Sequence, residues 1–148
     1  MTTKNKQHKN NLSYYELSLL SFLREDFPER AEDVEFIRER ADQAAETYSQ
    51  AIRNGYSHIE AEELASDALY QGLAFSPYNT LVNILWDEFS ENVSEDDAKS
   101  IALQILPLCG EILAKYSFQD DFIDSPEYDL LYTELTGTIQ ILLEDGKF

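Results

Sequence analysis

The stretch ADQAAETYSQAIRNGYSHIEAEELASDALYQGL (residues 41–73) predicts two consecutive helices joined by a tight turn. Apolar residues recur at helical spacing on both sides of Gly55, and alanines on the first helix would let a neighbouring helix approach closely. Gly55 stands where a left-handed C-cap belongs. Ser57 and Glu60 form a capping box that opens the second helix. We therefore expect one helix over about 33–54 and the next from 57 onward.

Upstream of this stretch, SYYELSLLSFLREDF (residues 13–27) predicts a first helix that stops before Pro28. Ser13 and Glu16 form its capping box. Apolar positions wrap most of the circumference of this helix, so we expect it to be central and largely buried.

Downstream, Ser76-Pro77 and Ser125-Pro126 each place an N-cap before a proline at the first helical position. A further helix is expected to start at Ser94, and its apolar period keeps phase through Pro107 as far as residue 116. Unbroken phase predicts one helix kinked at Pro107. Six helices with short connections, and no alternating strand pattern, predict an all-α fold, a single-domain multihelical bundle.

At 148 residues the chain is expected to form one domain over 12–148, preceded by a polar, basic, disordered tail over 1–11. The single cysteine, Cys109, excludes an intramolecular disulfide and a multi-cysteine zinc site. No signal-peptide core and no apolar run of membrane-spanning length are present in the sequence. We expect a cytoplasmic protein that needs no cofactor and contacts no membrane.

The net charge of −18 is unevenly placed along the chain. Residues 1–11 carry +3, residues 12–53 carry −5, and residues 54–148 carry −16. Such a chain repels nucleic acids and anionic lipids at long range and attracts basic partners.

Four segments resemble a family of small acidic all-helical proteins of unknown function from Bacteroidetes, whose genes often lie among those of mobile elements. The segments are SYYELSLLSFLRE (13–25), ADQAAETYSQAIRNGYSHIEAEELASDALYQGLAFSPYNTLVNIL (41–85), LPLCGEILAKY (106–116) and DSPEYDLLYTELTGTI (124–139). The resemblance covers about residues 12–145 and implies a multihelical all-α fold. It implies no activity, because the family has no catalytic motif to carry over.

Candidate catalytic residues are few. His58 is the one histidine within the expected domain over 12–148, and it lies between the two residues of a capping box. Cys109 lies on an apolar helix face, where a buried thiol is inert. We expect no enzymatic activity; the alternative is an enzyme that uses His58 with a carboxylate such as Glu60 or Asp67.

A metal site is not expected either. No histidine has a glutamate three residues before it, as di-iron helical bundles require. The acidic run of Asp120, Asp121, Asp124, Glu127 and Asp129 lacks the ligand spacing and turn glycine of a calcium loop. Acids at the start of a helix are favoured by the helix dipole, which explains the last three of them.

The acidic run and two tyrosines, Tyr56 and Tyr70, are the candidate partner-binding surface. The leading hypothesis is a non-enzymatic protein that binds a basic protein and no nucleic acid. One alternative is a DNA mimic or anti-restriction accessory of a mobile element, because one turn of duplex carries about twenty charges. Another is a purely structural or oligomerising helical protein.

Overall fold

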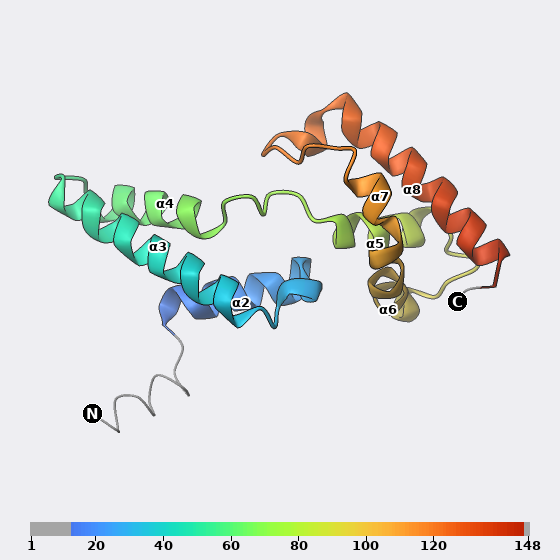
Figure 1. Ribbon diagram of the computed structural model, residues 1–148, viewed down its shortest axis with the longest axis horizontal. Coiled ribbons are helices and arrows are strands. Elements are labelled where there is room, and N and C mark those ends of the chain that lie inside the picture. Colours follow the sequence, from blue (N-terminus) through green and yellow to red (C-terminus); the bar gives the residue numbers. More distant parts are fainter. Residues whose placement is uncertain (1–12, 147–148) are drawn as a thin grey trace, which may run out of the picture. The chain divides into compact units, whose positions relative to one another are not determined.

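The computed structural model describes residues 13–146, and in this range the chain is all helical, with no strand. The basic tail expected over 1–11 lies outside the described residues. Figure 1 shows the predicted helices, one of them in two parts. Their bounds are α2 Tyr14–Asp26, α3 Val34–Arg53, α4 His58–Leu69, α5 Pro77–Glu88, α6 Glu95–Ile105 with α7 Gly110–Leu113, and α8 Pro126–Glu144. Short 3-10 helices are η1 Pro28–Arg30, η2 Leu106–Cys109 and η3 Phe122–Asp124.

The chain divides into two compact units at the bond between Gln71 and Gly72. Unit 1 contains α2, α3 and α4, and unit 2 contains α5 to α8. Gly72 has φ +79°, a backbone conformation that residues with a side chain rarely adopt. The prediction of one domain over 12–148 stays a prediction.

Unit 1 is built on the pairing of α3 with α4, which lie side by side (Figure 1). Both helices bury alanines, whose small side chains allow the paired helices to approach closely, as the sequence predicts. Gly55, at φ +92°, reverses the chain between the two helices. The buried alanines are Ala41, Ala44 and Ala51 on α3, and Ala61 and Ala65 on α4.

The prediction that the first helix is central and largely buried is wrong. Leu19 and Leu23 of α2 are fully buried, whereas Tyr14 is 71% exposed and Leu17 is 53% exposed. The capping box of Ser13 with Glu16 is confirmed. Within unit 1, α2 packs mainly against α3, and one neighbouring helix can cover only one face of a helix.

Unit 2 buries α5 most completely of its helices. Six residues of α5 are buried, and its buried side chains join those of α6, η2, η3 and α8 in one core. The N-cap at Ser76 is confirmed, since its hydroxyl accepts the backbone N–H of Asn79 at 3.0 Å. The buried residues of α5 are Tyr78, Thr80, Leu81, Val82, Ile84 and Leu85.

The helical path through Pro107 continues, as predicted, but with a 3-10 turn. Helix α6 ends at Ile105, and η2 leads into α7. Pro107 has no N–H to donate to the carbonyl of Leu103, so the α-helical bonding is interrupted there. The buried face keeps its phase across the interruption, through Ala98, Ala102, Ile105 and Cys109.

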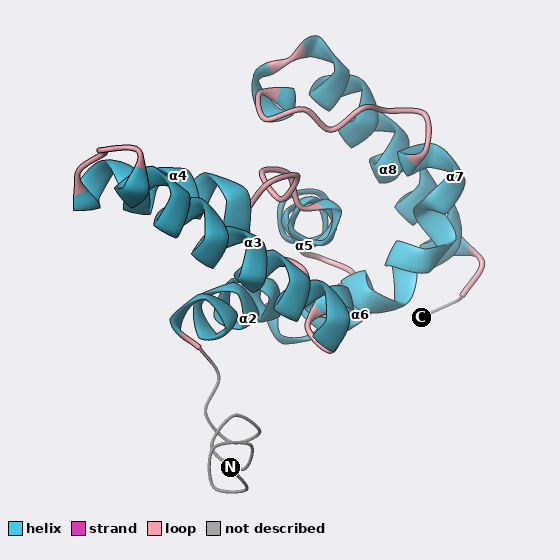
Figure 2. Ribbon diagram, turned by 60° about the vertical axis from the view of Figure 1, so that its left-hand side comes forward, coloured by secondary structure: helices cyan, strands magenta, loops and turns pink. Residues whose placement is uncertain are grey.

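Figure 2 shows the segment between α7 and α8 largely as a pink loop. An aromatic cluster holds this segment onto unit 2. The ring centroid of Phe75 lies 4.7 Å from that of Phe118 and 4.8 Å from that of Phe122. Phe118 and Phe122 meet edge to face at 4.9 Å. This segment carries much of the acidic run, so the cluster determines where those acids are displayed.

Candidate functional site

His58 is the first residue of α4, and its side chain is exposed. Its Nδ1 lies 2.6 Å from the Tyr48 hydroxyl, with which it forms a hydrogen bond. Glu60 accepts the backbone N–H of Ser57 at 3.0 Å, and hydrogen bonds from Ser57 lower the pKa of this carboxyl. Asp67 lies exposed on α4. These contacts give His58 and Glu60 a role in holding the turn before α4.

A shallow depression lies beside His58 on the surface of unit 1. Its described lining consists of side chains of α4 alone, and one of them, Ile59, is 74% exposed. A depression along one helix does not enclose a substrate as an active-site cleft does. The structure therefore places His58 at an open surface beside the turn that begins α4. The lining residues are His58, Ile59, Glu62, Glu63 and Ser66.

Cys109 lies in the core of unit 2 and is fully buried. Burial raises the pKa of its thiol to about 11. The thiol is therefore protonated at neutral pH, and the thiolate is the reactive form. Cys109 contributes apolar packing, as the sequence predicts.

Across residues 13–146, no three His, Cys, Asp or Glu side chains are placed to share a metal ion. In the same range, no helix is long and apolar enough to cross a bilayer.

The five acids of the acidic run are all exposed on unit 2, around the buried ring of Phe122. Asp120, Asp121 and Asp124 lie in and beside η3, and Glu127 and Asp129 lie in the first turn of α8. The expected side-chain cap by Ser125 is absent from α8. Instead, the Ser125 hydroxyl donates to the carbonyl of Phe122 at 2.6 Å. Ser125 is also the residue that ends η3, so its side chain caps η3 and not α8.

The two candidate tyrosines belong to unit 1 and not to the unit that carries the acidic run. Tyr70 is half-buried and meets Phe22 edge to face with centroids 5.1 Å apart, so it packs inside unit 1. Burial raises the pKa of Tyr70. Tyr56, in the turn before α4, is 48% exposed. The five acids therefore lie on unit 2, and the two tyrosines lie on unit 1.

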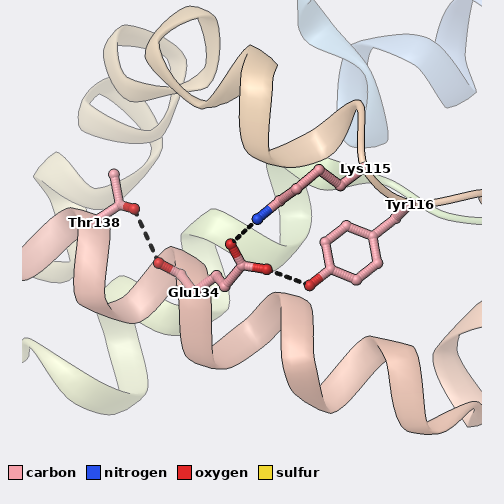
Figure 3. A network of polar contacts seen from close by, with 4 residues as sticks. All are labelled: Lys115, Tyr116, Glu134 and Thr138. Carbon is pink, nitrogen blue, oxygen red and sulfur yellow. Dashed lines mark hydrogen bonds and ion pairs between the residues drawn. The ribbon is translucent and has the colours of Figure 1, made fainter.

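A polar network on α8 escaped the sequence analysis. Figure 3 shows Glu134 accepting from the Lys115 ammonium with one carboxylate oxygen and from the Tyr116 hydroxyl with the other. The hydrogen bond from Lys115 lowers the pKa of Glu134, while the bond to Glu134 raises the pKa of Tyr116. The partners are 18 and 19 residues apart, and no local pattern signals such a pair.

A second polar contact joins α5 to α8. The Tyr132 hydroxyl donates to Glu88 at 3.2 Å, and burial together with the charge of Glu88 raises the pKa of Tyr132 to about 12. No local sequence pattern signals this pair, because Glu88 lies 44 residues before Tyr132.

The outer face of α8 was also missed. Leu130 is 60% exposed and Ile141 is 59% exposed, and they are among several large apolar side chains that unit 2 leaves exposed. The signal was present in the sequence, because both residues fall out of phase with the buried positions Leu131, Leu135 and Ile139.

The two units differ in charge balance. The described part of unit 1 holds fourteen acids and five arginines. The described part of unit 2 holds fifteen acids and two lysines, and one of these, Lys115, is paired with Glu134. Unit 2 is therefore the more strongly acidic surface.

The family described as "Domain of unknown function (DUF1896)" matches residues 7–148. The crystal structure of protein PG0816 from Porphyromonas gingivalis is similar, with 43% sequence identity and a TM-score of 0.87. That match covers 95% of this chain and 96% of the other. No curated protein matches significantly. Because the match spans nearly the whole sequence, the chain belongs to the DUF1896 family of unknown function.

Proposed function

We propose that this chain is a non-enzymatic binding protein that recognises a basic protein through the acidic surface of unit 2. The observation that carries the proposal is the charge of unit 2, with fifteen acids against two lysines in its described part. The acidic run supplies five of these acids, all exposed and held in place by the aromatic cluster.

Charge of this density attracts a cationic surface at long range and accelerates association. The attraction is screened within about 8 Å at physiological ionic strength, so binding should weaken steeply with added salt. Nucleic acid would be repelled by the same field, and so would an anionic bilayer. We further propose that the protein works in the cytoplasm, where such a partner would be another soluble protein.

The test is capture of proteins from host lysate on the immobilised full chain, with stepwise elution by salt and identification by mass spectrometry. Two variants make the test specific. In the first, the acidic run is neutralised by D120N, D121N, D124N, E127Q and D129N. The matched control neutralises five exposed acids of unit 1 by E32Q, E35Q, E39Q, D42N and E63Q.

We expect a basic protein to be captured by the parent chain and by the unit 1 variant, and to be lost from the unit 2 variant. Circular dichroism spectra and melting temperatures of both variants establish that they are folded. Equal capture by all three chains, or capture of proteins without net positive charge, would overturn the proposal. Capture of only the protein itself would favour an oligomerising role instead.

A further inference from the structure

Helix α8 buries one apolar face in the core of unit 2 and exposes two further large apolar side chains on its other side. Leu131, Leu135 and Ile139 are fully buried against the core. On the opposite face, Leu130 and Ile141 are 60% and 59% exposed. Eleven residues are close to three helical turns, so these two side chains lie on one line about 16 Å apart along the helix.

Gly137 lies on the same line, seven residues after Leu130 and four before Ile141. A Cβ atom at Gly137 would meet no other atom within 4 Å, so no packing contact of the chain requires glycine there. Glycine is unfavourable inside a helix compared with alanine. A glycine at such a position allows another backbone to approach α8 closely between the two large apolar side chains.

The negative charge around Leu130, Gly137 and Ile141 favours a positively charged partner. Glu127 and Glu144 are exposed at its two ends, and the nearby Lys115 is neutralised by Glu134. A second copy of this chain would bring another unit of the same strong negative charge against α8. Charge complementarity therefore favours a cationic occupant.

We propose that the outer face of α8, formed by Leu130, Gly137 and Ile141, docks an amphipathic basic helix of the partner protein. The inference rests on the proposed function and adds the binding mode. The apolar stripe of the partner helix covers Leu130 and Ile141 and crosses closest at Gly137, while its lysines or arginines lie beside Glu127 and Glu144.

The probe is a fluorescent peptide of about 20 residues made of Lys, Leu and Ala, with the Leu and Ala on one helical face. A scrambled peptide of the same composition controls for charge alone. The full chain is titrated against both, as parent and as the double variant L130S and I141S. The matched control is L108S, because Leu108 is 58% exposed elsewhere in unit 2. G137L places a bulky side chain at the crossing point.

We expect the amphipathic peptide to bind more tightly than the scrambled one. Loss of both apolar anchors should weaken binding by roughly tenfold or more, as should G137L, while L108S leaves it unchanged. G137A should raise the melting temperature of the free chain and still weaken binding, which loss of folding cannot explain.

Three other results would contradict the docking face on α8 without by themselves contradicting the proposed function. Equal, salt-sensitive binding of both peptides, unaffected by the α8 variants, would overturn the docking face and leave the acidic-surface proposal standing. Failure of both peptides to bind would also overturn the docking face, with the lysate capture deciding the proposed function. Self-association that L130S abolishes in sedimentation would overturn the basic helix as the occupant.

Discussion

The Tyr116 hydroxyl donates to the Glu134 carboxylate across 18 residues of sequence, and so ties the segment after α7 to the middle of α8. Lys115 holds the other oxygen of the same carboxylate. The acidic run begins four residues after Tyr116. The network therefore anchors the start of the segment that displays the candidate binding acids.

E134Q is expected to destabilise the chain most at neutral pH. The lowered pKa of Glu134 means that its stabilising effect is present above the usual carboxyl pKa and is lost as the pH falls through the folded value. The difference in free energy of unfolding between parent and E134Q should therefore shrink towards about pH 3. Urea unfolding at neutral and acid pH measures it. A difference that stays constant with pH would show that the ion pair contributes nothing.

Cys109 should react with thiol reagents only when unit 2 opens. The side chain is fully buried, and the pKa of its thiol is raised to about 11. In the folded state the reagent therefore cannot reach the sulfur atom, and almost none of the thiol is in the reactive thiolate form. We expect labelling by a disulfide reagent near pH 8 to be at least about a hundredfold slower than in denatured protein. As this is the only cysteine, the rate reports on unit 2 alone. Immediate labelling of the native chain would contradict the buried position.

Leu19 and Leu20 are neighbours on α2 with different burial, and they test the corrected position of this helix. Leu19 is fully buried, so L19A should lower the free energy of unfolding by about 2–5 kcal/mol. Leu20 is only half-buried, and L20A should cost clearly less. Equal losses in chemical denaturation would instead support a helix α2 that is central and largely buried.

The helices of this chain could be predicted because their signals are local. Capping boxes at Ser13 and Ser57, and the glycine at position 55, act within a few residues of the helix ends they determine. The degree of burial of α2 could not be predicted, since it depends on how many helices pack around it. The same applies to the network at Glu134, whose partners are joined only by tertiary packing.

The candidate site divides in the same way. The acidic run could be recognised because charge is read directly from the sequence. Its five acids are exposed in the structure, while Phe122 between them is buried. The contact of Tyr70 with Phe22 could not be predicted, because Phe22 lies 48 residues earlier on another helix. The exposure of Leu130 and Ile141 can be predicted from the sequence, because both residues fall out of helical phase with the buried apolar positions of α8.

P107A should change the free energy of unfolding by less than about 1 kcal/mol. Pro107 is exposed in the first turn of η2, and the helical path already runs through it. Alanine adds an N–H that can bond to Leu103, while it gives the unfolded chain more freedom, and these two effects oppose each other. Thermal unfolding measures the balance. A loss of several kcal/mol would show that proline itself maintains the turn between α6 and α7.

Arg40 on helix α3 forms hydrogen bonds with the backbone at the C-terminal end of the neighbouring helix α4. Its Nη1 donates to the carbonyl of Leu69, the last residue of α4, at 3.2 Å and to that of Gln71, two residues beyond the helix, at 2.6 Å. It therefore satisfies an acceptor that the end of α4 leaves without a helical partner. The guanidinium also lies 4.7 Å from the ring centroid of Phe36. Desolvation lowers the pKa of Arg40, and the charge of Arg30 lowers it further, yet arginine stays charged at any physiological pH.

R40M keeps the aliphatic packing and removes the donors, so it should destabilise the chain by about 1–3 kcal/mol. R40K retains the charge, but a single ammonium lacks the planar fork, and it should recover only part of the loss. R38M, at an exposed position on the same helix, is the matched control and should be nearly neutral. Hydrogen exchange should show the largest loss of protection in the last turn of α4. If R40M and R38M behaved alike, the two carbonyls would be satisfied by water, and Arg40 would have no part in ending α4.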